Sequence, residues 1–422
     1  MLVNASEAVP PPLDGVRVID LTTTFMGPYA TMLMARMGAD VVKVEAPTGD
    51  VVRYIGRGRH PGMGPIFLSV NHGKRSIALD LKRPDAREAL HRLLEGADVF
   101  VTNLRPAALA GLGLSADELL VAHPRLVCAA LPGFGGGGPY RDRAAYDDVV
   151  QAACGIADVQ GGAGEPVYVR TVVADKTVAL MGLAAINAAL LGVQRTGRGR
   201  SVEIPMFETM VSFTLLEQQN ARVLDPPAGP AGYARTSSPH RRPYATSDGH
   251  LGVVVYTDRQ WLSFFALIDR PDLARDERFS TITGRTEHID ELYALLAEVL
   301  PTRSSAEWIA VLGAAGIPVQ PVLGPDDLFD DPHLAAVGMF EGVEHPDEGA
   351  LVLPRLPVTV DGALPARVRG APRLGEHGPA VLAEAGFDEH EITALAGSGA
   401  MVVPDREEVR DGDQAVGGAR AE

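Results

Sequence analysis

The chain has 422 residues, enough for two or more domains with a substantial core, so its folding requires neither disulfides nor metal ions. It carries 54 acidic and 38 basic residues, and the formal charge of -16 argues against a nucleic-acid-binding surface. The N-terminus is polar and rich in proline, and the apolar runs fall short of the about 18 residues that span a bilayer. We therefore expect a cytoplasmic protein with no nucleic-acid and no membrane partner.

Strand and helix patterns alternate along the first 134 residues. A β-rich run ends at Leu21, a helix follows Gly27 and Pro28, and a second strand comes directly after that helix. Helices between successive strands imply a parallel sheet, which binds its ligands at the carboxyl ends of the strands. The predicted strands are 16–21, 39–45, 76–82, 98–104 and 125–134, and helices are predicted at 84–97 and near 115–124. The loops expected to share one rim of the sheet are 22–28, 46–53, 103–106 and 134–146.

Helical patterns dominate residues 147–224, apart from a turn and a short strand around 195–206. The Pro-, Gly- and Ser-rich stretch 225–243 is interpreted as a linker, and the segment after it as a hairpin whose turn is Asp248-Gly249. Helices that contain Trp261 and Trp308 complete a smaller domain. Strands within 351–362 are then expected to rejoin the first domain.

The fold class predicted from these patterns is α/β, with a Rossmann-like parallel-sheet large domain and a smaller α+β domain. The predicted segments are the N-terminal part of the large domain at 1–225, the small domain at 226–325, a return to the large domain at 326–403 and a disordered tail at 404–422.

Several common cofactor and hydrolase motifs are missing from the sequence. The turn after the first strand has a single glycine in place of G-x-G-x-x-G, and Pro28 removes a backbone donor there. The glycine run 133–140 lacks the Lys-Ser/Thr of a Walker loop, and no H-E-x-x-H or G-x-S-x-G is present. Cys128 and Cys154 have no C-x-x-C spacing and are expected in the core of a reduced protein. We expect no metal and no permanently bound cofactor.

Asp175 stands near the start of a long apolar segment, 171–192, whose only other charged residue is the adjacent Lys176. Two interpretations are open. Aspartate is a favoured N-cap residue, so Asp175 can serve simply to start a helix. Alternatively it is a reagent, because the helix dipole favours a negative charge at this end while the apolar body of the helix excludes water. The spacing alone favours the cap.

A series of motifs runs in order from Leu13 to Met210: "LDGVRVIDL", "GADVVKVEAPTGDVVR", "NHGKRSIALDLK", "DVFVTNLRP", "GFGGGGPYRDRAAYDDVVQAACG", "VADKT" and "RTGRGRSVEIPMFETM". This series resembles the class III coenzyme A transferases, a family that includes formyl-CoA and carnitine-metabolism transferases and α-methylacyl-CoA racemases. Weaker similarity covers much of 240–375. The resemblance implies an interlocked homodimer, with coenzyme A bound as a substrate in the form of acyl-CoA and a small organic acid as the second substrate.

The resemblance implies a chemical role for Asp175, which matches the family's carboxylate nucleophile in "VADKT". Such a carboxylate attacks an acyl-CoA thioester, forms a mixed acyl-aspartyl anhydride and releases the CoA thiolate. Tyr146 and Asp147 match a Tyr-Asp motif and are also expected at the catalytic site. Racemases of the family carry a histidine where this chain has Tyr146, and an unperturbed phenol, with a pKa near ~10, is a poor acid or base at working pH. A transferase is therefore favoured over a racemase.

The resemblance also assigns residues to the binding of coenzyme A. Positive side chains suit its phosphates. Phe25 replaces a glutamine of the formyl-CoA transferases, and Ala46 replaces a residue that is often basic in those enzymes. These two differences favour an acid substrate larger than formate or oxalate. Thr23, Thr24, Phe25 and Met26 are expected to line the pantetheine and thioester end, Lys74 and Arg75 to lie near the nucleotide, and Asn103, Leu104 and Arg105 to border the same groove.

The leading hypothesis is thus CoA transfer between an acyl-CoA and a free carboxylic acid. One alternative is an α-methylacyl-CoA racemase or epimerase, which exchanges the α-proton without an acceptor acid. Another is a non-catalytic CoA-binding subunit, which binds CoA and forms no acyl-enzyme.

Overall fold

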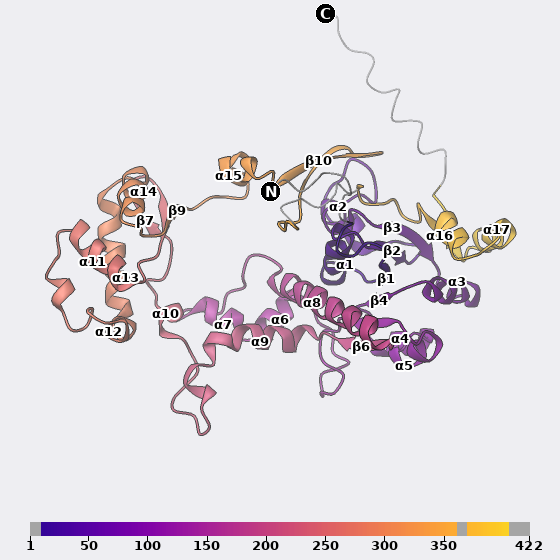
Figure 1. Ribbon diagram of the computed structural model, residues 1–422, viewed down its shortest axis with the longest axis horizontal. Helices are drawn as coiled ribbons and strands as arrows, with labels where there is room; N and C mark the ends of the chain where they lie inside the picture. Colours follow the sequence, from indigo (N-terminus) through magenta and orange to yellow (C-terminus); the bar gives the residue numbers. More distant parts are fainter. Residues whose placement is uncertain (1–9, 361–368, 405–422) are drawn as a thin grey trace, which may run out of the picture. The chain divides into compact units, whose positions relative to one another are not determined.

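The computed structural model of the protein describes residues 10–360 and 369–404, which form two compact units (Figure 1). The first unit contains residues up to 150, 171–210 and those from 338 on, and the second contains 151–170 and 211–337. The predicted small domain, 226–325, falls entirely within the second unit, and the exact bounds of the predicted segments stay a prediction. The predicted tail lies outside the described residues, apart from Pro404.

A seven-stranded sheet is the framework of the first unit, in the order β12-β3-β2-β1-β4-β5-β6. All neighbouring strands are parallel except β12 and β3, so the predicted α/β fold with a mostly parallel sheet is confirmed. The strands are β1 (Arg17–Leu21), β2 (Asp40–Glu45), β3 (Arg75–Leu79), β4 (Val99–Thr102), β5 (Val127–Ala130), β6 (Arg200–Glu203) and β12 (Met401–Val402). The helices of this unit are α1 (Met26–Arg36), α2 (Pro65–Asn71), α3 (Pro84–Glu95), α4 (Pro106–Leu112), α5 (Ala116–Ala122), α8 (Val173–Thr196), α16 (Gly378–Glu384) and α17 (Glu389–Gly397).

The two faces of the sheet carry different side chains, because successive residues of a strand point to opposite sides. Val42 and Val44 of β2 belong to an apolar core that also contains side chains of α3, α16 and α17. Lys43 and Glu45 alternate with them and are buried on the other side, where α1 packs against the sheet and against α8. Charged residues are therefore buried on the α1 face.

The second unit contains a small antiparallel sheet in the order β7-β8-β9, packed with helices. The predicted hairpin is confirmed, with Thr246 N–H donating to the Gly249 carbonyl at 2.9 Å. Trp261 and Trp308 are buried in one core cluster, as the predicted helices required. The elements are β7 (Tyr244–Ala245), β8 (His250–Val253), β9 (Val319–Pro321), α7 (Ile156–Gly161), α10 (Ala234–Ser237), α11 (Asp258–Leu267), α12 (Ile282–Glu287), α13 (Ile289–Val299), α14 (Ser305–Ala314) and α15 (Pro332–Ala336). The chain passes between the units within α6 (Asp147–Ala153) and α9 (Met206–Gln218).

Three details differ from the sequence prediction. The stretch 225–243, interpreted as a linker, contains helix α10 and is bonded to α9, where Gln218 accepts the N–H groups of Gly232 and Tyr233 at 2.8 and 3.1 Å. Residues 351–360 rejoin the first unit as expected, but their strand β11 (Gly349–Pro354) pairs, within the described residues, with β10 (Phe340–His345) in a separate hairpin and not with the seven-stranded sheet. Strand β12 was not predicted, because two residues are too few to show the alternation of apolar and polar residues that indicates a strand.

Helix α8 is the one helix among the described residues that is long and apolar enough to cross a membrane, with a mean hydropathy of 1.7 over its 18-residue window. The expectation that every apolar run is too short was wrong here, since no charged residue interrupts the helix between Lys176 and Arg195. A core helix meets the same criterion, and α8 packs against α1 and β5 within the first unit. The expected cytoplasmic location stays a prediction.

Candidate active site

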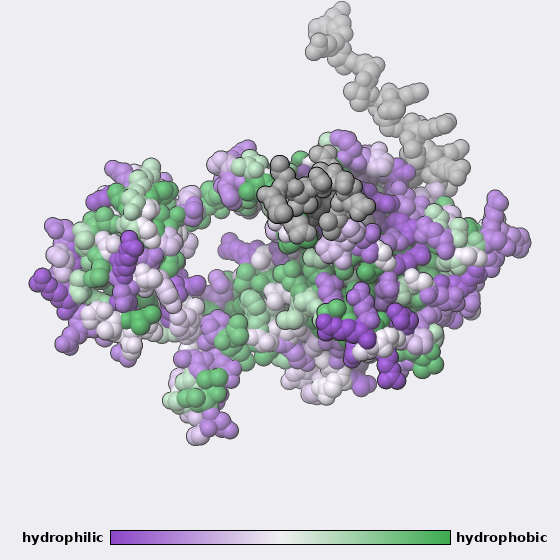
Figure 2. All heavy atoms as spheres, viewed as in Figure 1, coloured by the Kyte–Doolittle hydropathy of each residue, from purple (hydrophilic) through white to green (hydrophobic). Residues whose placement is uncertain are grey.

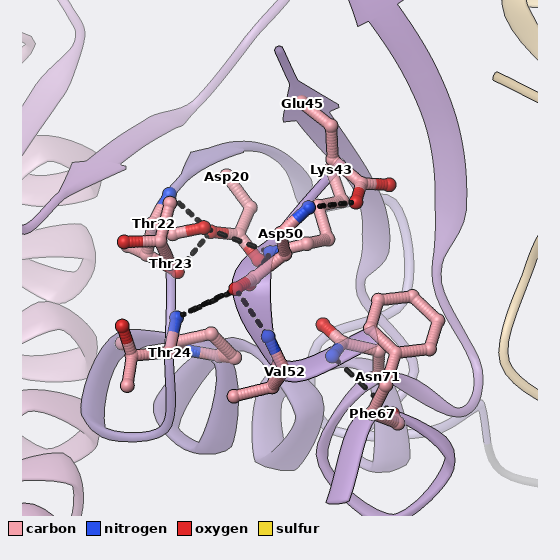
Figure 3. A network of polar contacts seen from close by, with 12 residues as sticks. Asp20, Thr22, Thr23, Thr24, Lys43, Glu45, Asp50, Val52, Phe67 and Asn71 are labelled. Carbon is pink, nitrogen blue, oxygen red and sulfur yellow. Dashed lines mark hydrogen bonds and ion pairs between the residues drawn. The ribbon is translucent and has the colours of Figure 1, made fainter. Parts of the chain in front are cut away.

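Three loops meet at the carboxyl edge of the parallel sheet, after β1, β2 and β4. The first is bonded to the third, because Thr23 N–H donates to Asn103 Oδ1 at 3.0 Å and Asn103 Nδ2 donates to the Thr23 carbonyl at 2.9 Å. It is bonded to the second as well, since Thr24 N–H donates to both carboxylate oxygens of Asp50, at 3.0 and 3.2 Å (Figure 3). The prediction that these loops share one rim is confirmed.

The fourth loop of the rim, after β5, is held by two carboxylates. Gly135 N–H donates to Glu208 at 2.9 Å, and Gly136 N–H donates at 2.8 Å to Glu203, the last residue of β6. The glycine run is therefore tied to the carboxyl end of the neighbouring strand. The loop then leads to Asp147 at the start of α6.

Charged side chains form a buried network directly beneath the first loop (Figure 3). Lys43 Nζ donates to the Thr22 carbonyl at 2.8 Å and to Asp50 at 3.0 Å. Lys74 Nζ donates to Asp20 at 3.0 Å, and Asp20 also accepts the N–H of Thr22 at 3.0 Å. Burial acts to raise the pKa of Asp20, but Lys74 and Lys43 outweigh it and lower that pKa to about 2. Asp20 is therefore ionised at neutral pH.

A second ion pair extends this network. Arg53 donates to both oxygens of Glu45, each at 2.7 Å, and Ser76 Oγ donates to the same carboxylate at 2.7 Å. Burial favours the neutral acid, but the Arg53 guanidinium prevails and lowers the pKa of Glu45. Three acids balance three bases, which limits the cost of burying so many charges. The six charged members are Asp20, Lys43, Glu45, Asp50, Arg53 and Lys74.

Asp147 caps helix α8. Its Oδ2 accepts the N–H groups of Ala174 at 2.8 Å and Asp175 at 3.0 Å, two donors in the first turn that have no partner within the helix. Val172 occupies the N-cap position without a side-chain bond, and Asp175 is the third residue of the helix. The interpretation of Asp175 as the cap, which its spacing alone favoured, is therefore wrong.

The topology places the start of α8 on the same rim. Helix α8 connects β5 to β6, and because these strands are parallel the helix runs back along the sheet from its carboxyl edge. It packs against α1, which begins at that edge too. Asp175 and the loop 22–28 thus belong to one edge of the first unit.

The Asp175 carboxylate has no counter-ion and accepts no hydrogen bond within the described part of the chain. The adjacent Lys176 donates instead to Thr171 Oγ1, at 2.7 Å. Burial and then the charge of Asp147 raise the pKa of Asp175 from 3.8 to about 7. An isolated, partly buried carboxylate of this kind is poorly hydrated and more basic than an ordinary aspartate, which are properties of a nucleophile or a proton acceptor.

The other predicted site residues differ in accessibility. Phe25 is partly exposed beside the ring of Tyr29, with 5.9 Å between centroids, and Met26 is buried as the first residue of α1. Leu104 packs partly against the core, while Arg105 is exposed just before α4. Tyr146 is 70% exposed. All of these residues follow strand ends of the parallel sheet, as the expected groove requires.

Lys74 and Arg75 do not extend into such a groove. The Lys74 side chain is fully buried, and its ammonium group also donates to the Pro28 carbonyl at 2.9 Å. Arg75 is held by Glu384 and by Asp40, the first residue of β2, which lies towards the amino edge of the sheet. A direct role in binding the nucleotide stays a prediction for both, and their ion pairs do not favour it.

Residues 13–378 match the sequence profile of CoA-transferase family III. The chain belongs to this family. The recognition of a class III CoA-transferase from the ordered motifs is thereby confirmed for nearly the whole chain, which includes all nine predicted CoA-binding positions and Asp175.

Relatives and solved structures agree with this assignment. Succinate–glutarate CoA-transferase of Agrobacterium fabrum is 31% identical over 393 residues, which cover 89% of this chain and 96% of the relative. Formyl-CoA:oxalate CoA-transferase of Streptomyces avermitilis is 32% identical over 409 residues, covering 92% and 99%. The crystal structure of a CaiB/BaiF family protein from Brucella suis matches with a TM-score of 0.75 and 31% identity, covering 89% of this chain and all of that one.

Sequence reasoning missed the buried network of this family III CoA-transferase. A signal for part of it was present: Lys43 and Glu45 alternate with valines in "DVVKVE", and charged residues are almost never fully buried unless they are paired. Their partners Asp50 and Arg53 follow within ten residues. The third pair joins Lys74 to a residue 54 positions earlier, and no local pattern indicates it.

Proposed function

We propose that the protein transfers coenzyme A between an acyl-CoA and a free carboxylic acid, with Asp175 as the nucleophile. The observation that carries the proposal is the Asp175 carboxylate itself, which is partly buried in the first turn of α8 and has no counter-ion among the described residues, in a chain of CoA-transferase family III. Its raised pKa of about 7 leaves roughly half of it ionised at neutral pH.

The proposed reaction keeps the acyl and CoA groups in balance. A carboxylate oxygen of Asp175 attacks the thioester carbon, the C–S bond breaks, and the CoA thiolate leaves with the electron pair, which gives the mixed anhydride. The thiolate then attacks the Asp175 carbonyl and expels the donor acid. The acceptor carboxylate displaces the thiolate from this aspartyl thioester to form a second anhydride, and thiolate attack on the acceptor's acyl carbon releases the new acyl-CoA and free Asp175.

Two features of the chain support Asp175 in this role. Burial removes water from its oxygens, and the charge of Asp147 further disfavours the ionised form, so the carboxylate that does ionise is a strong nucleophile. The N-terminal end of α8 opposes this effect and favours negative charge. Asp147 influences Asp175 by its negative charge and by fixing the first turn of α8, because its Oδ2 accepts the N–H groups of that turn.

We propose that the working form is the homodimer that the motifs imply. The apolar side chains Leu180, Met181 and Leu191 of α8 are each about half exposed in the single chain. Covering such a surface with a second copy is favourable by roughly 25 cal/mol for each Å² removed from water. Light scattering during gel filtration should give twice the mass of one chain, and the mass of a single chain would contradict the dimer.

The activity is tested with a panel of acyl-CoA donors and free acids, with new thioesters detected by mass spectrometry. Succinate, glutarate, mesaconate, oxalate and formate form the first panel because they occur in the names of relatives. We expect an acceptor larger than formate or oxalate, since the apolar Phe25 replaces the glutamine of the formyl-CoA transferases in the first loop. A parallel incubation in deuterium oxide without an acceptor acid separates the alternatives: rapid deuterium uptake at the α-carbon indicates a racemase, and CoA binding without new thioesters indicates a non-catalytic subunit.

A further inference from the structure

Thr24 has a backbone conformation that its residue type disfavours. Its φ is 74°, in the left-handed region, where a β-branched side chain is crowded. Only three described residues other than glycine have a positive φ, and Thr24 is the one on the rim. Such a conformation persists only where surrounding contacts impose it. The contacts of this loop therefore indicate what maintains its shape.

Three side chains bind three successive residues of the loop, and two of them, Lys43 and Asp50, are fully buried. Lys43 donates to the carbonyl of Thr22, and Asn103 bonds both the N–H and the carbonyl of Thr23. Asp50 accepts the N–H of Thr24 with both of its oxygens. Of these three contacts, the one made by Asp50 is at the strained residue itself (Figure 3).

Asp50 is itself held rigidly. Its side chain is fully buried, Lys43 donates to it at 3.0 Å, and it also accepts the N–H of Val52 at 3.3 Å. Both carboxylate oxygens are used, one shared by Thr24 and Val52 and the other by Lys43 and Thr24. Asparagine has the same shape but only one acceptor oxygen, so it cannot replace all of these bonds.

We propose that Asp50, oriented by Lys43, is a positioning residue that keeps the loop Thr23–Met26 in the conformation that receives acyl-CoA. This inference rests on the proposed function, in which that loop lines the thioester end of the substrate. A loop that is ordered before binding loses little freedom when the ligand arrives, so the contact between Asp50 and Thr24 lowers the KM for acyl-CoA. Without it Thr24 relaxes to a negative φ and the loop must be reordered at each binding event.

The test combines Asp50→Asn with Thr24→Gly. Asp50→Asn should raise the KM for acyl-CoA and the Kd for CoA by between about 5-fold and 150-fold, the range expected for one strained residue, with a smaller change in kcat. Thr24→Gly alone supplies the reference values for the pair, because the threonine side chain belongs to the proposed binding loop whereas glycine adopts a positive φ freely. In the Asp50→Asn background it should restore most of the lost affinity, a rescue that a general structural defect would not show.

Asp98→Asn is the matched control, since its carboxylate accepts the N–H of Arg17 at the opposite end of the same sheet. It should leave KM and Kd unchanged. Asp50→Glu, which keeps a charge for Lys43, replaces Asp50→Asn if that variant is insoluble, and the same weakening is expected. An affinity within twofold of wild type in the Asp50 variant, or a loss that Thr24→Gly leaves uncorrected, would overturn the proposal.

Two readouts separate this proposal from the proposed function. The Kd for CoA is measured by calorimetry and needs no turnover, whereas trapping of acylated Asp175 with hydroxylamine reports the nucleophile. If Asp175 is trapped in the wild-type protein and Asp50→Asn leaves the affinity for CoA unchanged, the positioning role of Asp50 is overturned while the nucleophile stands. If no acylated Asp175 is trapped in the wild-type protein and Asp50→Asn weakens CoA binding, the positioning role of Asp50 is supported and the role of Asp175 as nucleophile is contradicted.

Discussion

Asp175→Asn is expected to stabilise the folded protein at neutral and alkaline pH while it abolishes CoA transfer. Burial and the charge of Asp147 raise the pKa of Asp175 from 3.8 to about 7. The difference between these two pKa values corresponds to about 4 kcal/mol, and water at the partly exposed oxygens reduces this to about 2 kcal/mol. Asparagine has nearly the same volume and no charge, so it removes this cost and the nucleophile together.

The sign of the pH dependence follows from proton binding. The folded protein retains the Asp175 proton up to about pH 7, whereas the unfolded chain releases it near 3.8. The ionised group therefore reduces the free energy of unfolding progressively as the pH rises between these values. The gain from Asp175→Asn should be absent near the lower value, grow through the interval and be complete above pH 7.

Urea unfolding of wild type and variant at several pH values measures this difference directly. Asp142→Asn, which changes an exposed aspartate of the same unit, controls for the loss of one charge. A variant that is less stable than wild type at pH 8, or a gain that is equal at all pH values, would refute the assignment of a destabilised carboxylate. Retained CoA transfer in the same variant would refute its role as nucleophile.

Three further predictions concern the same unit. The kcat/KM for acyl-CoA should increase with pH through about 7, because the ionised form of Asp175 reacts, and Asp147→Asn should move the midpoint of that profile to lower pH. Asp147→Ala should cost about 1 kcal/mol of unfolding free energy through loss of the α8 cap, measured in urea near pH 4, where Asp175 is neutral in the folded protein. Asp20→Asn should cost about 3–5 kcal/mol in the same assay at pH 7, since it removes the counter-ion of the buried Lys74, whose pKa burial already lowers to about 8; a loss below 1 kcal/mol would contradict the importance of that pair.

The parallel sheet and its functional edge were predictable because both depend on local patterns. The valines of β2 and the regular succession of strands and helices identify the sheet, and the geometry of parallel strands then places the loops after Leu21, Glu45 and Thr102 at one edge. The predicted hairpin at Asp248-Gly249 follows equally from turn chemistry. Each of these inferences needs only neighbouring residues.

The parts that sequence reasoning missed depend on contacts between distant residues. The cap of α8 is supplied by Asp147, 27 positions before Ala174, while the local pattern pointed to Asp175. The family resemblance placed Lys74 near the nucleotide, and no local pattern indicates that its ammonium group pairs with Asp20 of β1. Strand β12 pairs with β3 across more than 300 residues. No periodicity within one segment encodes such pairings.

Hydroxylamine trapping tests the central claim most directly, that Asp175 becomes acylated. Wild-type protein is incubated with acyl-CoA and hydroxylamine, digested and analysed by mass spectrometry, with Asp175→Asn and a reaction lacking acyl-CoA as controls. The account predicts a hydroxamate on the peptide that contains Asp175, which requires both acyl-CoA and the native carboxylate. An unmodified peptide under conditions in which the wild-type protein transfers CoA, or a hydroxamate on a different carboxylate, would contradict it.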